Sequence, residues 1–245
     1  DALFFMSREQ ARALAKLAVE GSNDKAAYKE AIKAAPSVDM VLFGRMVASD
    51  PSLNYDAAIQ VAHSISTHAV QNEFDYFTAM DDSEQKDNAG AGHLGTVEYN
   101  SSTLYRYANV NVREVAEHLG KAETPAVVRA FVEGFIRSMP AGKQNPFANR
   151  TLPDAVYIAL RSDQPVNLCG AFEKAVPASP EGFVGPSKAR LVRCAQDLYE
   201  SFAQAPDWAL TIGSGWEALA PARPLQAALN DLEGELQRRL GNGVE

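Results

Sequence analysis

The residues of this chain with the clearest chemical potential gather in one stretch, 74–112. Thioether, hydroxyl and aromatic side chains alternate there just before a pair of carboxylates, Asp81 and Asp82. Flexible or flat apolar side chains can wedge or stack between nucleic-acid bases without reading their sequence, whereas carboxylates suit Mg²⁺ and metal-assisted catalysis. Three side chains suit wedging or stacking against bases and are expected to lie at the entry of a hairpin: Phe77, Thr78 and Met80.

Three side chains outside this stretch have comparable chemistry. Met46 follows Gly44 and Arg45, and its thioether suits a base wedge, with a core methionine as the alternative. Arg45 suits a phosphate contact or stacking on a base, and its alternative is a surface ion pair. Lys143 lies in a loop beside small residues, where a flexible point charge suits phosphate, with a solvated lysine as the alternative.

The histidines and tyrosines give weaker signals. His63 and His68 are five residues apart, a spacing that does not share a helical face, so we predict neither a metal site nor a cofactor. His93 is expected to order the loop at the hairpin tip or to approach RNA. Tyr105 and Tyr107 resemble the exposed aromatics of an RNA-binding sheet, although a strand with one face in the core is the favoured interpretation.

Hydrophobic periodicity and turn residues predict the elements that position these side chains. Helices are expected over 7–20, 23–35, 55–66, 113–119, 124–139, 168–176, 187–202 and 224–240. Strands are expected over 38–43, 67–80, 103–112, 155–161 and 208–212, with a loop over 83–95. The order of these elements is not a strict alternation, which predicts an α+β fold with an antiparallel or mixed sheet.

Composition limits the kind of partner. The 245 residues carry a net charge of −8, and residues 38–120 hold four Lys or Arg against twelve Asp or Glu. This balance argues against a free-standing basic nucleic-acid binder. No apolar run approaches the length of a membrane span, and the start does not read as a signal peptide. Cys169 and Cys194 follow no motif, so we expect reduced, buried thiols in a cytoplasmic protein.

Six blocks between Val38 and Val176 resemble, in order and spacing, the CasC family, the crRNA-binding backbone subunits of the type I-E CRISPR Cascade complex. The blocks read VDMVLFGRM, AAIQVAHSISTHAV, DYFTAMDD, GHLGTVEYNSSTLYRYANVNV, SMPAGKQNPFA and NLCGAFEKAV. The resemblance implies an RRM-like (ferredoxin-like) palm, helical fingers and a β-hairpin thumb. Residues 1–36 would end the fingers, and 37–245 would form the palm, with the thumb at about 74–112. The family's basic N-terminal palm segment has no counterpart here, so we expect the C-terminal two-thirds of such a subunit.

The resemblance also implies a function, that of a non-catalytic subunit which binds crRNA. Such a subunit assembles with copies of itself and other Cascade subunits as a filament along the guide. It kinks guide and target for pairing in antiviral defence, so its partners are crRNA and, through guide pairing, target DNA, with no membrane. The RNA-binding residues expected here are Arg45, Met46, Phe77, Thr78, Met80, His93 and Lys143.

Two alternatives remain open at this point. Related subunits of type III CRISPR complexes cut RNA with a thumb-loop aspartate and a divalent metal, a role that Asp81 or Asp82 would take. The other alternative is a purely structural oligomerisation module, in which the thumb grips only the next copy. We predict that the chain is not an enzyme.

Overall fold

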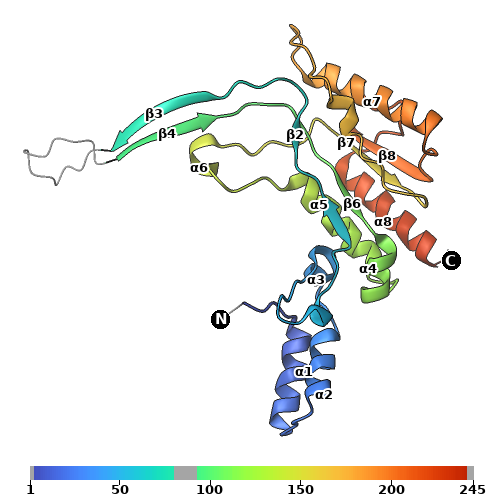
Figure 1. Cartoon of the computed structure of the whole chain (residues 1–245). Helices are drawn as coiled ribbons and strands as arrows, with labels where there is room; N and C mark the ends of the chain where they lie inside the picture. Colours follow the sequence, from blue (N-terminus) through green and yellow to red (C-terminus); the bar gives the residue numbers. More distant parts are fainter. Residues whose placement is uncertain (1–2, 80–92, 242–245) are drawn as a thin grey trace, which may run out of the picture. The chain divides into compact units, whose positions relative to one another are not determined.

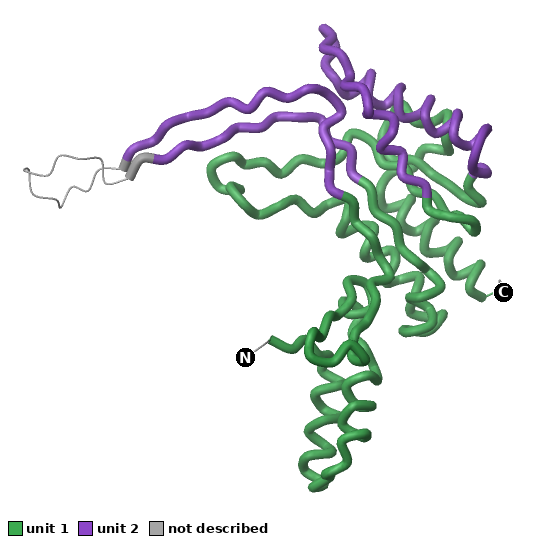
Figure 2. Tube along the Cα trace, viewed as in Figure 1, with its two compact units in different colours: residues 1–62, 107–165, 206–245 green, residues 63–106, 166–205 purple. Residues whose placement is uncertain are grey.

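The computed structural model describes residues 3–79 and 93–241 (Figure 1). These residues form two compact units, each assembled from separate parts of the chain (Figure 2). Unit 1 comprises residues 1–62, 107–165 and 206–245, and unit 2 comprises 63–106 and 166–205. The two units are described in turn.

Unit 1 begins with a helical pair, α1 (Arg8–Val19) and α2 (Lys25–Lys33). A capping box begins α1, because Gln10 N donates to Ser7 Oγ at 3.0 Å and Ser7 N donates to Gln10 Oε1 at 3.1 Å. These two bonds satisfy backbone donors that the first turn of a helix leaves free. The second helix is capped by Asp24, whose Oδ1 accepts from Ala26 N at 2.8 Å.

Two predictions for the next segment are wrong. The expected strand over 38–43 is the short helix α3 (Val38–Phe43), which buries Met40, Val41 and Leu42. A short run with five apolar residues out of six fits a buried helix as well as a buried strand. The expected helix over 55–66 is instead mostly extended, with the 3₁₀ turn η1 (Pro51–Leu53) before it and the strand β1 (Ile59–Val61) inside it.

A first core in unit 1 forms around the β1 strand. It pairs antiparallel with β6 (Ala108–Val110), so that Ile59 lies opposite Val110. The predicted helix that follows is confirmed as α4 (Val112–Leu119), and it begins where Asn111 Oδ1 accepts from Glu114 N. The buried side chains of this core are Val41, Leu42, Ala58, Ile59 and Val115.

A second core of unit 1 lies on the pair of strands β7 (Ala155–Leu160) and β8 (Trp208–Gly213). The strands are antiparallel, and both were predicted, as were the helices α5 (Thr124–Arg137) and α8 (Leu225–Gly241) that contact each other. The buried side chains of this core are Val128, Leu232 and Leu236. A loop carries the one-turn helix α6 (Gln144–Phe147).

Unit 2 contains two antiparallel strand pairs. β2 (Ile65–Ser66) pairs with β5 (Leu104–Tyr105), and β3 (Glu73–Ala79) pairs with β4 (His93–Tyr99). The pair β3–β4 is the predicted hairpin. It ends at Tyr99 rather than near residue 112, because β5 and β6 pair with β2 and β1 instead. Figure 2 shows this pair as a two-stranded ribbon leading away from the rest of its unit.

The remaining elements of unit 2 are helical. The predicted helix over 187–202 is α7 (Val184–Ser201), whereas 168–176 forms only the 3₁₀ turn η2 (Cys169–Phe172). The prediction that both cysteines are buried is wrong for Cys169, which is exposed. Cys194 is half-buried, and burial raises the pKa of its thiol.

The strand pairings confirm the α+β class. Within residues 3–79 and 93–241 the sheets are two-stranded and antiparallel, and β1 to β6 follow one another along the chain before the helices α4 and α5. In that part of the chain, no helix is long and apolar enough to cross a membrane.

Candidate nucleic-acid interface

Met46 is an exposed member of the predicted RNA-binding residues in unit 1. Its side chain is 83% exposed, so the alternative of a core methionine is wrong. The chain reaches it through Gly44, which ends α3 with φ +78. A Cβ at Gly44 would lie only 2.9 Å from the carbonyl oxygen of Tyr55, so this turn requires glycine. Met46 therefore projects from a tight turn at the end of a buried helix.

Arg45 lies beside Met46 but has the opposite environment. It is 6% exposed, and its guanidinium donates to Leu53 O at 2.7 and 3.1 Å and to Phe5 O at 3.2 Å. It also donates to Gln10 Oε1 and Ile32 O, both at 3.3 Å. A phosphate contact and a surface ion pair were both predicted for this residue. Neither fits, because a buried guanidinium engaged by carbonyls is not presented to a ligand.

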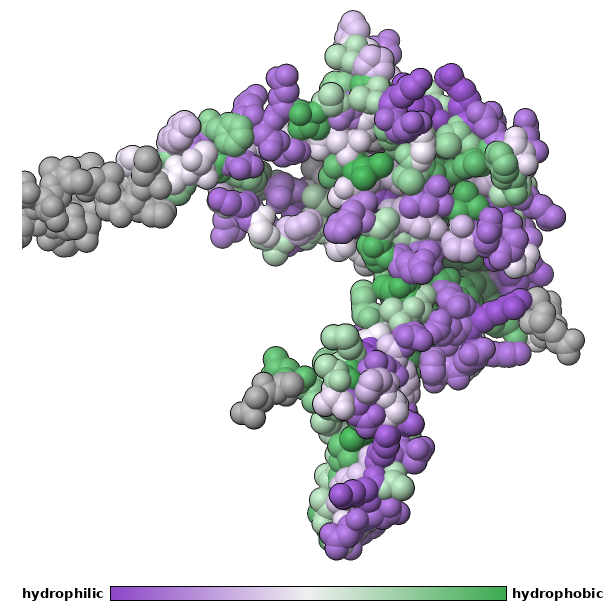
Figure 3. All heavy atoms as spheres, in the orientation of Figure 1, coloured by the Kyte–Doolittle hydropathy of each residue, from purple (hydrophilic) through white to green (hydrophobic). Residues whose placement is uncertain are grey.

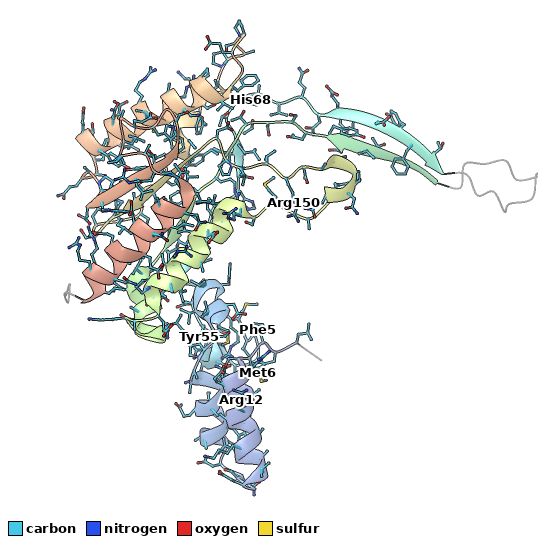
Figure 4. All side chains as sticks on the ribbon, turned by 180° about the vertical axis from the view of Figure 1, so that it is seen from behind. Phe5, Met6, Arg12, Tyr55, His68 and Arg150 are labelled. Carbon is cyan, nitrogen blue, oxygen red and sulfur yellow. The ribbon has the colours of Figure 1, made fainter. Side chains whose placement is uncertain are left out.

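Two aromatic rings complete the surroundings of Arg45. The guanidinium carbon lies 4.9 Å from the centroid of Phe4 and 5.1 Å from that of Tyr55, within cation–π range. Figure 4 shows Phe5 and Tyr55 on neighbouring segments of this region. Burial lowers the pKa of Arg45 and raises the pKa of Tyr55. Arg45 is thus a structural residue that joins the N-terminal segment to the loop after α3.

Sequence reasoning missed one apolar side chain, Phe43. It is 64% exposed and lines the same shallow surface depression as Met46, together with Asn54 and Asp56. No signal in the sequence separates it from its neighbours, because it ends an apolar run whose other members are mostly buried. Two large apolar side chains therefore border one depression of unit 1.

The β3–β4 hairpin presents the second group of predicted residues. Phe77 is paired with Gly95, and Thr78 with Leu94. The ring of Phe77 covers Gly95, since a Cβ there would lie 2.4 Å from the nearest ring carbon. Phe77 is nonetheless 42% exposed and Tyr76, on the other face, is 74% exposed. Both faces of the hairpin thus offer aromatic surface to a partner.

Four predicted positions lie within residues 80–93 of the sequence. Met80, Asp81 and Asp82 lie outside the described residues. His93 was expected in a loop, but its backbone begins β4 opposite Ala79. Strand pairing therefore includes residues 93–95, which were predicted to belong to a loop over 83–95.

The described strands of the hairpin are acidic. Glu73, Asp75 and Glu98 lie on β3 and β4, and no Lys or Arg occurs within 73–79 or 93–99. Figure 3 shows hydrophobic and hydrophilic side chains interspersed along this ribbon. Phosphate contacts normally come from Lys and Arg, so these strands suit stacking and van der Waals contact instead.

We predict that Gly95→Ala displaces the Phe77 ring without unfolding the hairpin. The new Cβ would overlap the far end of a side chain that can rotate, so the unfolding free energy should change by less than about 1 kcal/mol. Proton NMR checks this, because the ring-current shift at the α-position of residue 95 should be lost. Thr96→Ala, on the opposite face, should keep the shift. A retained shift in Gly95→Ala would contradict the packing described.

Lys143 occupies a surface loop of unit 1. Its side chain is exposed, and it directly precedes α6. The backbone is in the left-handed region both at Lys143, with φ +58, and at Ala148 after α6, with φ +46. Non-glycine residues in this region carry strain that is often found at binding sites. The side-chain oxygen of Gln144 accepts hydrogen bonds from the guanidinium of Arg150, and this contact connects α6 to the segment that follows it. The geometry thus presents the lysine to solvent.

The two tyrosines and His68 are structural. Tyr105 OH donates to Asn167 Oδ1 at 3.0 Å and accepts from Leu168 N at 3.0 Å, which supports the core interpretation for this residue. Tyr107 lies in unit 1, half-buried, within hydrogen-bond reach of Asn109. His68 is 9% exposed and engaged on both ring nitrogens.

Comparisons with known proteins define the class. The fold matches chains from solved CRISPR RNA-guided surveillance complexes. One, from a complex described as pre-nicking, is 33% identical with a TM-score of 0.73, and the match covers 84% of this chain and 58% of that one. Another, from a complex described as a CRISPR RNA-guided surveillance complex, is 31% identical with a TM-score of 0.71, covering 94% and 85%. No curated protein matches the sequence.

The family follows from a match along almost the whole chain. The protein belongs to the CT1975-like protein family, which matches residues 1–236. The family resemblance predicted from the six sequence blocks is thereby confirmed. The chain spans 58% of the relative that is 33% identical to it, which is little more than half of that relative's length.

Proposed function

We propose that this chain is a non-catalytic backbone subunit of a type I-E CRISPR Cascade complex that binds crRNA. The observation that carries the proposal is Met46, an apolar side chain that is 83% exposed on a tight, glycine-dependent turn. An exposed thioether on a fixed backbone suits insertion between bases of any sequence. The 31–33% identity to chains of RNA-guided complexes supports the same role.

The other parts of the proposal follow from the same role. Unit 1 would contribute to an RRM-like palm, and the β3–β4 hairpin would serve as the thumb, with Phe77, Thr78 and Met80 at the kink. Lys143 would contact the phosphate backbone. Copies of the subunit would line the crRNA with other Cascade subunits, and target DNA would be engaged through guide pairing in the cytoplasm. Sequence specificity then lies in base pairing, as in other RNA-guided systems.

Met46→Ala tests this function. In the complex assembled with a guide RNA, we expect about tenfold weaker target binding, since one wedge or stacking contact contributes roughly 1–3 kcal/mol. Met6→Ala is the matched control, because Met6 is a partly exposed methionine of the same unit in the N-terminal segment. Unchanged affinity for guide and target would favour a purely structural module instead.

The absence of catalysis is tested separately. Guide-paired RNA and DNA are incubated with Mg²⁺ and the assembled complex, and we expect no cleavage by this subunit. Cleavage that is lost on Asp81→Ala or Asp82→Ala would replace the proposal with a nuclease function.

A further inference from the structure

The backbone on both sides of Met46 is fixed by side chains and by a bridge to one loop. Arg45 N donates to Tyr55 O at 3.0 Å, and Tyr55 N donates back to Arg45 O at 2.9 Å. On the other side, Val47 N donates to Asn54 Oδ1 at 2.6 Å. The Met46 side chain is mobile in principle, but its Cα is held from both directions.

The Arg45 guanidinium anchors that loop to the rest of unit 1. Its acceptors come from four places in the chain: the N-terminal segment, α1, α2 and η1. All of them are neutral oxygens, so the interaction fixes position through several directed bonds rather than through one ion pair. A rigid, planar donor set of this kind restrains the segments that it joins.

Asn54 acts on the same turn from the surface. It follows η1, where its backbone N donates to Pro51 O at 3.1 Å, and its side chain accepts from Val47. It is exposed and borders the depression beside Met46. Its contact with Val47 can therefore be removed without opening a core.

We infer that Arg45 and Asn54 are positioning residues that hold Met46 ready for insertion against a nucleobase. A ligand-binding side chain whose backbone is already ordered loses less entropy on binding, and small displacements of such a group weaken binding. This inference rests on the proposed function, because it names the residues that act through the Met46 wedge. Neither residue needs to touch the nucleic acid.

A double-mutant cycle in the assembled complex tests the inference. Asn54→Ala should weaken target binding about threefold when Met46 is present, and less than about 1.5-fold in a Met46→Ala background. Arg45→Lys keeps the charge but has fewer donors, and should show the same dependence on Met46. Ser52→Ala, in the same loop, should change binding in neither background.

The outcomes separate the inference from the function on which it rests. Equal losses on Asn54→Ala with and without Met46 would overturn the positioning role and leave the wedge in place. No effect of Met46→Ala itself would overturn both. If Arg45→Lys does not fold, Asn54→Ala still decides, since its side chain lies at the surface. Thermal melts of each variant in both backgrounds show whether stability alone explains a loss.

Discussion

Replacing Arg45 by alanine is expected to lower the free energy of unfolding by about 3–5 kcal/mol. The change leaves the carbonyls of Phe5, Ile32 and Leu53 without this donor and removes two cation–π contacts, while Gln10 Oε1 keeps only its bond from Ser7 N. Urea denaturation followed by circular dichroism measures the loss.

A surface arginine provides the control for that experiment. Arg12 pairs with Glu9 at 3.6 Å, but its side chain is 76% exposed. Arg12→Ala should change the unfolding free energy by less than about 0.5 kcal/mol. If Arg45→Ala were as mild as this control, the buried network would not have the structural role assigned to it.

Replacing His68 by alanine is expected to cost about 3 kcal/mol of stability, the second-largest effect. The ring of His68 stacks on Phe183, with centroids 3.7 Å apart. Its Nδ1 lies 2.8 Å from Ala69 O, and its Nε2 accepts from Thr103 N at 3.1 Å. Alanine would leave a buried cavity and an unpaired amide at the base of the hairpin.

The measurement is denaturant unfolding together with limited proteolysis of unit 2. His63 serves as the control, because it is exposed, and His63→Ala should leave both readouts unchanged. Faster cleavage near 67–72 in His68→Ala would locate the loss at the hairpin base. Equal stability of the two alanine variants would contradict the structural role of His68.

The regularly patterned elements could be predicted from the sequence. The helix expected from Thr124 lies at Thr124–Arg137 and buries Val128 and Ile136, because its apolar residues repeat with the helical period. The strands over 155–161 and 208–212 were also found, since β-branched and aromatic residues mark them. Local periodicity was sufficient where one face of an element packs on a core.

The site was harder to predict, because its geometry depends on distant contacts. Nothing local shows that Arg45 donates to Phe5, forty residues earlier in the chain. The pattern over 55–66 suits a helix, yet Ile59 pairs with Val110, and this long-range pairing decides its structure. Exposure of Met46 and Phe43 likewise follows from a glycine turn rather than from hydrophobicity. The residue types of the site could be interpreted from the sequence, whereas the burial or exposure of each side chain could not be predicted from it.

The acidic character of the hairpin strands has a thermodynamic consequence. Binding through Lys and Arg releases condensed counterions, so affinity falls steeply with salt. The described strands hold Glu73, Asp75 and Glu98 and no Lys or Arg, so the base contacts proposed for them would release none. The share of affinity that these strands contribute should therefore be nearly independent of ionic strength. In the proposed function, conditions that weaken phosphate contacts elsewhere would therefore leave the described strands with a growing fraction of the affinity for the guide.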